Sequence, residues 1–246
     1  MNPDSTAYFP RGLHQPEQGY RFSVDSLLLA AFASPASNTR VADLGCGCGV
    51  VGLGLLLQNK GLDIQVTGLD VDPVMIKCAR HNARLLGMQD KFQAVEAHVA
   101  QVDNKSFSPE SFDMVIMNPP YRPINSGRVP DEPSRQKALF CSRETLGHFL
   151  RAASFLLKNR AVLNIVFGAE RLAELIEHMK EHNITLVKIL PVHGRRQKPA
   201  RLVLVQGRKN TGPGTTLLPG LVLYDHLNRL TPQALQFCPC LGCNRV

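Results

Sequence analysis

The stretch "VADLGCGCGVVGLG" (Val41–Gly54) decides the fold. The apolar residues at 40–44 predict a short buried strand, and those at 50–59 predict a helix. Glycines fill the turn between them, where glycine permits positive φ and lets the backbone approach a ligand closely. They stand at positions 45, 47, 49 and 52. In a doubly wound α/β sheet, the first strand–turn–helix crossover is where a nucleotide-like ligand binds.

The flanking sequence continues this alternation of strands and helices. Further strands are expected at 63–70, 91–97, 112–117, 161–168, 184–191 and 200–206. Helices are expected at Phe22–Ala33, from Pro73 onward, at 143–158 and at 169–182. Such alternation predicts a parallel sheet with helices on both faces. Because no helix separates the last two strands, they should form a hairpin. The predicted fold class is α/β: a doubly wound, mostly parallel seven-stranded sheet with an antiparallel last strand.

Two helices carry more detailed expectations. Ser23 or Asp25 is the expected N-cap of the first. The helix that begins at Pro73 should turn its apolar residues toward the sheet: Val74, Ile76, Ala79, Ala83 and Leu86. The chain then divides into three segments: an N-terminal arm and helix over the ligand site (1–35), the α/β domain (36–209), and a C-terminal appendage (210–246).

Composition narrows the function classes. Lys and Arg outnumber Asp and Glu by 28 to 20 in 246 residues, and the net charge of +8 favours a polyanionic partner such as nucleic acid. The start of the chain is unlike a signal peptide, and the apolar runs are too short to span a bilayer. We therefore expect a cytoplasmic protein without membrane association. Seven cysteines, an odd number, then indicate reduced thiols rather than a disulfide framework.

The glycine turn leaves two ligand classes open. Gly47, Gly49 and Gly52 satisfy the dinucleotide pattern G-x-G-x-x-G, and Asp70 stands 21 residues after Gly49, where an acid can hold ribose hydroxyls. This pattern suits a nicotinamide-dependent dehydrogenase. Asp43 argues for another ligand, because a carboxylate there would repel a pyrophosphate but attract an amino-acid ammonium group.

The second informative stretch is "FDMVIMNPPYRP" (Phe112–Pro123), a buried strand that ends in Asn118, Pro119, Pro120 and Tyr121. Proline lacks an N–H, so the segment is stiff, extended and presents carbonyl groups without competing donors. The Asn118 side-chain carbonyl and the Pro119 backbone carbonyl could accept hydrogen bonds from a weakly nucleophilic amine and aim its lone pair at the methyl group of S-adenosylmethionine. Tyr121 could stack on a planar base. The bland alternative is a turn that ends an edge strand.

Taken together, "DLGCGCG", "GLDVDP" and "NPPY" resemble class I S-adenosylmethionine-dependent methyltransferases that act on amino nitrogens. "GYRFSVDSLLLAAFA", "NPPYRP" and "VHGRRQKPARLVLVQGRK" are similar to the bacterial tRNA (adenine-N6)-methyltransferases that modify adenosine 37 of a valine tRNA. This resemblance covers roughly residues 10–209. It implies a Rossmann-like fold, S-adenosyl-L-methionine as cofactor, and methyl transfer to the exocyclic N6 amine of an adenine in tRNA.

The resemblance also implies roles for individual residues. The methionine part of the cofactor would be held by Asp43, Leu44, Gly45, Gly47 and Gly49. Asp70 would bind the ribose and Val71 would lie against the adenine, while Arg21 and Asp25 would close over the pocket. Asn118, Pro119, Pro120 and Tyr121 would receive the target amine and base, and Asn118 would also contact the cofactor. Where the family usually places an acid on the cofactor adenine, this chain has His98, with Asp103 further on, so that contact is unassigned.

Rival functions share parts of this pattern. A release-factor glutamine N5-methyltransferase must also methylate a weakly nucleophilic nitrogen, that of a side-chain amide. An RNA-binding module could keep a vestigial cofactor site. Two basic clusters favour tRNA, because they could follow phosphates beside a base flipped into the pocket. One is Arg195, Arg196, Lys198, Arg201, Arg208 and Lys209, and the other is Arg122, Arg128, Arg135 and Lys137. "CPCLGC" near the C-terminus offers three thiols where metal sites usually need four ligands, so we expect no metal. No stable protein partner is expected.

Overall fold

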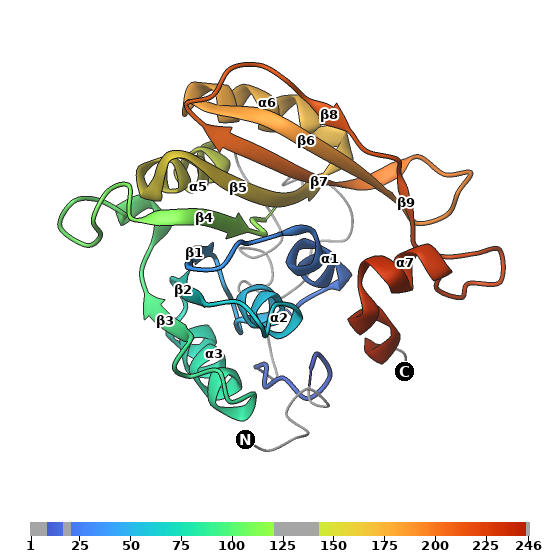
Figure 1. Cartoon of the computed structure of the whole chain (residues 1–246), viewed down its shortest axis with the longest axis horizontal. Helices are drawn as coiled ribbons and strands as arrows, with labels where there is room; N and C mark the ends of the chain where they lie inside the picture. Colours follow the sequence, from blue (N-terminus) through green and yellow to red (C-terminus); the bar gives the residue numbers. More distant parts are fainter. Residues whose placement is uncertain (1–8, 17–20, 121–142, 245–246) are drawn as a thin grey trace.

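The structure is a computed structural model that describes residues 9–16, 21–120 and 143–244 (Figure 1). The strands are β1 (Thr39–Leu44), β2 (Ile64–Asp70), β3 (Phe92–Glu96), β4 (Phe112–Met117), β5 (Leu157–Gly168), β6 (Ile184–His193), β7 (Ala200–Lys209), β8 (Thr216–Leu217) and β9 (Leu221–Val222). The α-helices are α1 (Val24–Phe32), α2 (Val50–Gln58), α3 (Pro73–Leu85), α5 (Arg143–Leu156), α6 (Leu172–Glu181) and α7 (Pro232–Phe237). The described residues also form the short 3₁₀ helices η2 (Val99–Gln101), η3 (Ala169–Arg171) and η4 (Pro239–Asn244).

All the strands join one sheet in the order β3-β2-β1-β4-β5-β7-β6-β8, with β9 also on β6. The first five strands in this order are parallel, and β7 runs antiparallel to both of its neighbours, β5 and β6. The predicted α/β class, the mostly parallel sheet and the antiparallel hairpin at its end are confirmed. Two short strands beyond the predicted seven lengthen the sheet at β6.

Helices cover the sheet on both faces, as Figure 1 shows. Alternate residues of each strand point to opposite sides, so Val41 and Ile116 pack on one face and Ala42 and Val115 on the other. Helices α1, α2 and α3 cover the first face, and α5 and α6 cover the second. None of the helices in the described ranges is long and apolar enough to cross a membrane.

Some local predictions need correction. Val74 is 49% exposed, although it was expected to face the sheet. Successive residues of a helix turn by about 100°, so the stripe set by Ile76, Ala79 and Ala83 leaves Val74 on the outer side. Ser23 is the N-cap of α1 by backbone conformation, and Asp25 lies in the first turn instead. The strand predicted to begin at 161 begins at Leu157, immediately after α5 ends.

The C-terminal segment packs on the sheet and on α1. Its strands β8 and β9 pair in parallel with β6, and its buried residues Ala234, Cys238 and Leu241 belong to the same core as Leu27 of α1. The Cys238 thiol is fully buried, with its Sγ 3.5 Å from the backbone oxygen of Leu27. The segment therefore helps to fix the position of α1.

Candidate active site

The tips of three adjacent strands bring the predicted site residues together. Leu44, the last residue of β1, pairs with Leu69 of β2 on one side and with Met117 of β4 on the other. The next residues, Gly45, Asp70 and Asn118, therefore stand side by side at the carboxyl edge of the sheet. Neighbouring strands lie about 4.8 Å apart, so Asn118 is a strand's width from the glycine turn. This is the edge at which open α/β sheets bind ligands.

The glycine turn has the backbone conformation that its sequence predicted. Gly45, Gly47 and Gly49 have φ of 70°, 54° and 85°, which other residues rarely adopt. The backbone N–H groups of Gly45 and Cys46 donate to Leu69 O at 2.8 and 2.9 Å and hold the turn against β2. Nothing lies within 4 Å of where a Cβ on Gly47 would stand, so the turn is open at that point.

Gly49 is required by both conformation and space. It is the N-cap of α2, and a Cβ there would lie 3.1 Å from Leu53 and from Phe92. We expect Gly49→Ala to lower the free energy of unfolding by about 1–3 kcal/mol, because positive φ and crowding both oppose a methyl group. Urea denaturation measures this loss. Gly61→Ala is the matched control, since its added methyl would meet nothing within 4 Å, and an equal loss in both variants would contradict the prediction.

Asp43 lies beneath the turn with one oxygen unused. The Gly52 N–H donates to its Oδ2 at 3.0 Å, whereas the buried Oδ1 has no hydrogen-bond partner among the described residues. The residue is 1% exposed, and this burial raises the pKa of Asp43 to about 7, helped by the nearby charge of Asp70 and opposed by the Gly52 hydrogen bond. An unpaired buried carboxylate favours a cationic donor, so the site fits the ammonium group of an amino acid.

Asp70 joins the turn to the tip of β2. Its Oδ2 accepts a hydrogen bond from the Gly47 N–H at 2.8 Å and its Oδ1 accepts one from the Asp72 N–H at 2.9 Å. Burial raises the pKa of Asp70 despite these bonds. Each carboxylate oxygen can accept more than one hydrogen bond, so capacity for hydroxyl groups remains. Val71, next in the chain, is 58% exposed, so its side chain is accessible to a ligand at this edge.

Asn118 is anchored by a residue that the sequence interpretation passed over. Its Nδ2 donates to the Ser26 hydroxyl of α1 at 3.0 Å, across 92 residues of sequence. Ser26 is 3% exposed, so this contact is internal. A polar residue directly before "LLLAAFA" was the available signal, but only the packing of α1 against the sheet shows what it contacts.

The other predicted residues differ in burial and in whether the structure describes them. Leu44 is fully buried in the core, so only its backbone could face a ligand. Pro119 is buried and Pro120 half-buried directly after Asn118. Arg21 is exposed just before α1, and Asp25 lies in the first turn of that helix, beside Ser26. Tyr121, Arg122, Arg128, Arg135 and Lys137 lie outside the described residues.

The two candidates for the adenine contact, His98 and Asp103, both make hydrogen bonds to nearby backbone groups. His98 is the exposed N-cap of η2, and its Nδ1 accepts a hydrogen bond from the Ala100 N–H at 3.0 Å. Asp103 accepts hydrogen bonds from the backbone of Lys105 and Ser106 in an exposed turn. Both side chains therefore stabilise local structure.

The two cysteines of the glycine turn, Cys46 and Cys48, are not reactive thiolates. Burial raises the pKa of Cys48 to about 12, and burial raises that of Cys46 as well, so both thiols are protonated at neutral pH. In the tail, the Sγ atoms of Cys238 and Cys240 lie 3.1 Å apart. Across the described ranges, no three His, Cys, Asp or Glu side chains gather as a metal ion requires.

The fold separates the basic residues between Arg195 and Lys209 into two groups at opposite ends of β7. Arg195, Arg196 and Lys198 are exposed in the turn between β6 and β7. Since β6 runs parallel to β5 and β4, this turn lies at the same edge of the sheet as Asn118. Arg208 and the buried Lys209 lie at the far end of the ten-residue β7, so the prediction that they act with the others is wrong.

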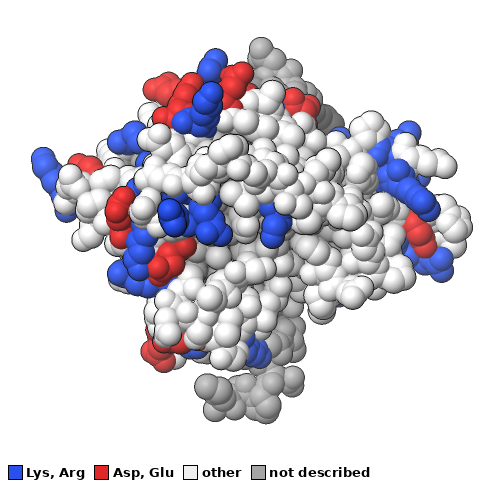
Figure 2. Space-filling model, turned by 45° about the horizontal axis from the view of Figure 1, so that its top comes forward, with Lys and Arg blue, Asp and Glu red and all other residues white. Residues whose placement is uncertain are grey.

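The basic turn is joined by the C-terminal segment. The Tyr224 N–H donates to Gly194 O at 3.0 Å, and Arg195 hydrogen-bonds Asn228. Arg229 is exposed there and pairs with Asp225 at 2.9 Å. Figure 2 shows the result at the right edge of the molecule, where blue Lys and Arg atoms surround a small red area.

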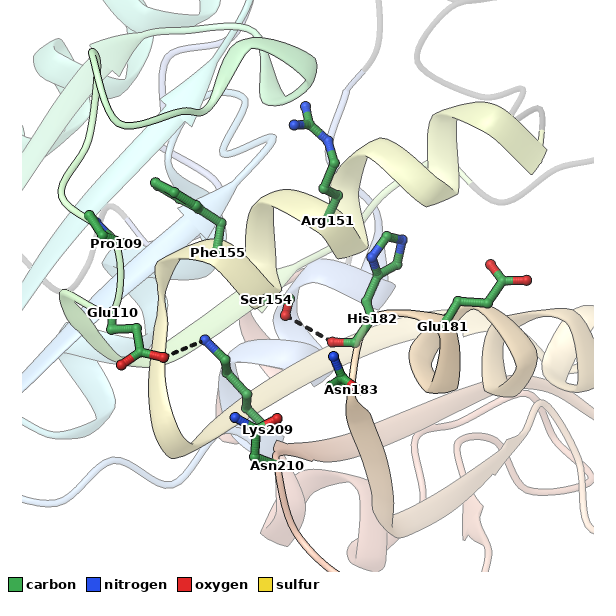
Figure 3. Close-up of a pocket in the computed structure, with 10 residues that line it drawn as sticks. All are labelled: Pro109, Glu110, Arg151, Ser154, Phe155, Glu181, His182, Asn183, Lys209 and Asn210. Atoms are coloured by element: carbon green, nitrogen blue, oxygen red, sulfur yellow. Dashed lines mark hydrogen bonds and ion pairs between the residues drawn. The ribbon is translucent and has the colours of Figure 1, made fainter.

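The hollow in Figure 3 is a different place from the strand tips. It is lined by Glu110, which precedes β4, and by Lys209, which ends β7, so it lies at the opposite edge of the sheet. Lys209 Nζ pairs with Glu110 Oε1 at 2.9 Å, and the Ser154 hydroxyl donates to His182 O at 2.8 Å. These groups satisfy one another and serve the structure.

Comparison with known proteins agrees with this geometry. Residues 23–132 match the family model of the methyltransferase small domain. The chain is similar to proteins named tRNA1(Val) (adenine(37)-N6)-methyltransferase. The protein from Actinobacillus succinogenes is 24% identical over 88% of this chain and 87% of its own length. The one from Mannheimia succiniciproducens is 28% identical over 87% and 84%.

Solved structures share the fold. A predicted O-methyltransferase from Agrobacterium tumefaciens superposes with a TM-score of 0.71 at 21% identity, covering 88% of this chain and 96% of its own. The geranyl diphosphate C-methyltransferase of Streptomyces coelicolor gives 0.52 at 12% identity, over 76% and 75%. The methyltransferase family match, the fold and the geometry at the strand tips lead to one conclusion. Residues 23–132 match a methyltransferase small domain, and the sequence motifs, the fold and the strand-tip geometry agree with an S-adenosylmethionine-dependent methyltransferase.

Proposed function

We propose that the protein transfers a methyl group to the exocyclic N6 amine of an adenine in tRNA, in the cytoplasm where tRNA is found. The observation that carries the proposal is the adjacency of Asn118 and Pro119 to the glycine turn, fixed by the pairing of Leu44 with Met117. The Asn118 side-chain carbonyl and the Pro119 backbone carbonyl would then lie beside the methyl donor. The relatives named for tRNA methylation over most of the chain support this substrate.

The proposed site has a cofactor side and a substrate side, formed by different residues. On the cofactor side, Asp43 Oδ1 would pair with the ammonium group, Asp70 would hold the ribose hydroxyls, and the exposed Val71 would lie against the adenine ring. Leu44 and the glycines 45, 47 and 49 would contribute only backbone atoms there. Arg21 and Asp25 would close this side from the start of α1. The bound cofactor supplies an electrophilic methyl carbon.

On the substrate side, the task is to orient a poor nucleophile. The lone pair of an adenine N6 amine is delocalised into the ring, and acceptors on its two N–H bonds favour the tetrahedral nitrogen that can attack. Asn118 Oδ1 and Pro119 O would be those acceptors. Tyr121 and Pro120 would pack against the flipped base. The rate then depends on positioning and hydrogen bonding, with no strong general base required.

A direct test measures the product on RNA. Tritiated methyl transfer from S-adenosylmethionine is compared for tRNA from a strain lacking the gene and for a release factor. Mass spectrometry of the tRNA nucleosides then identifies the modified base. We expect label in tRNA as N6-methyladenosine. Label on the release factor alone would establish glutamine methylation instead, and tRNA binding without turnover would favour an RNA-binding module.

We further propose that Arg195, Arg196 and Lys198 contact the tRNA backbone. Their turn joins β7 and β6, which are two and three strands from β4, or about 10 and about 14 Å at the usual strand spacing, within reach of nucleotides flanking a flipped base. Phosphate contacts of this kind give affinity and register without base specificity. Arg122 and Arg128, on the chain immediately after the site, would contact phosphates closer to the target base.

Replacing these three residues with alanine should raise the KM for tRNA at least tenfold and leave kcat unchanged. The dependence of log Kd on log salt should also lose about two to three units of slope, since that many phosphate contacts disappear. The control replaces the exposed Lys60, Lys77 and Lys105, which removes the same charge elsewhere on the molecule. An equal rise in KM and an equal loss of salt dependence in the control variant would show that net charge alone causes the effect.

A further inference from the structure

The buried hydrogen bond between Ser26 and Asn118 has a consequence for the site. Within the described part of the chain, the 3.0 Å bond from Nδ2 to the Ser26 hydroxyl is the one hydrogen bond of the Asn118 side chain. Asparagine has two ends of equal shape and opposite polarity, an NH2 donor and a carbonyl acceptor. A partner that occupies the NH2 leaves the carbonyl directed away from it.

The position of Ser26 is fixed by its own helix. The next three residues of α1, Leu27, Leu28 and Leu29, are fully buried, and the Cys238 Sγ of the C-terminal segment lies 3.5 Å from Leu27 O. Helix α1 also packs on α2, which follows the glycine turn. The backbone at Ser26 cannot move away from Asn118 without unpacking these leucines.

We propose that Ser26 is a positioning residue that holds the Asn118 amide with its carbonyl oxygen toward the target amine. This inference rests on the proposed function of Asn118 as an acceptor. If the amide turns over, the NH2 group faces the amine, and two donors oppose each other at the point where the site needs an acceptor. Ser26 touches neither substrate nor cofactor in this arrangement and acts only through Asn118.

A shape-matched pair of variants separates the hydroxyl from its volume. Thr and Val occupy the same space at position 26, and only Thr keeps a hydroxyl. Any crowding by the extra methyl group is common to both. We expect Ser26→Val and Ser26→Ala to lower kcat about tenfold, with the KM for tRNA and the Kd for S-adenosylmethionine changed less than twofold. Ser26→Thr should be at least fivefold faster than Ser26→Val. Ser34→Ala, at an exposed position just beyond the same helix, should match the wild type.

A second readout does not depend on turnover. The side-chain NH2 resonances of Asn118, assigned by comparison with Asn118→Asp, report the hydrogen bond through their shifts and their exchange with water. They should exchange faster in Ser26→Ala and keep wild-type behaviour in Ser26→Thr. Wild-type kcat in both Ser26→Ala and Ser26→Val, or an unchanged Asn118 NH2 signal in Ser26→Ala, would overturn the inference. A wild-type protein that methylates no tRNA would refute the proposed function instead, and the NH2 signal would still decide whether Ser26 holds the amide.

Discussion

Asn118→Ala should lower the rate of methyl transfer to tRNA by at least a hundredfold. The substitution removes an acceptor aimed at the reacting amine, and loss of one group that meets developing charge in other enzymes costs about a hundredfold to a thousandfold in kcat. Cofactor affinity should change little, because the glycine turn, Asp43 and Asp70 are held by their own hydrogen bonds. Single-turnover methylation and calorimetric titration of S-adenosylmethionine measure the two quantities separately.

The pattern of losses tells a chemical role from a structural one. Asn104→Ala, in an exposed turn before β4, is the control and should keep full activity. A parallel loss of turnover and cofactor binding in Asn118→Ala would show that the strand tip has collapsed. A kcat near the wild-type value in Asn118→Ala would show that the Asn118 side chain is not needed for catalysis. The proposal that it accepts a hydrogen bond from the target amine would then be wrong.

The second large effect concerns Asp43 and pH. Burial raises its pKa from 3.8 to about 7 in the folded protein, so between these values the folded state binds a proton that the unfolded state does not. Stability of the cofactor-free protein should therefore fall as the pH rises from about 4 to about 7 and level off above that. A shift of about three units corresponds to a fall of about 4 kcal/mol, as an order of magnitude.

Asp43→Asn should remove this component of the pH dependence and lose the rise in Tm that S-adenosylmethionine gives the wild type. Urea denaturation between pH 4 and 8 measures the first, and thermal unfolding with and without cofactor measures the second. Asp90→Asn, an exposed substitution before β3, is the control and should keep both behaviours. If the free energy of unfolding depends on pH equally in the wild type and Asp43→Asn, Asp43 keeps an ordinary pKa. If S-adenosylmethionine raises the Tm of Asp43→Asn as much as that of the wild type, Asp43 does not contact the ammonium group.

Much of the fold was readable from local patterns. The glycine turn, the alternation of strands and helices and the hairpin without a helix all depend on neighbouring residues, so the seven main strands, their mostly parallel arrangement and the antiparallel hairpin followed from them. The misplaced residues have a local cause as well. Val74 is apolar and near a helix start, yet the phase of the helix, set by Ile76 and Ala79, turns it outward.

The partly correct basic cluster shows what strand geometry adds. Arg195 and Arg208 are 13 residues apart in a segment that reads as one positive run. A strand rises about 3.3 Å per residue, so β7 places its two ends at opposite edges of the sheet. Only Arg195 and its turn share the edge of Asn118, while Lys209 is buried in an ion pair with Glu110.

The sequence by itself determined that a carboxylate, a glycine turn and an Asn-Pro-Pro corner follow strands of one parallel sheet, because short-range spacing dictates each of these. Tertiary structure alone decided that Ser26 meets Asn118 across 92 residues and that Asp43 Oδ1 is buried under the turn with no partner in the described part of the chain. Such contacts depend on how α1 and α2 pack against the sheet. Many side chains settle that packing together, and no single motif encodes it.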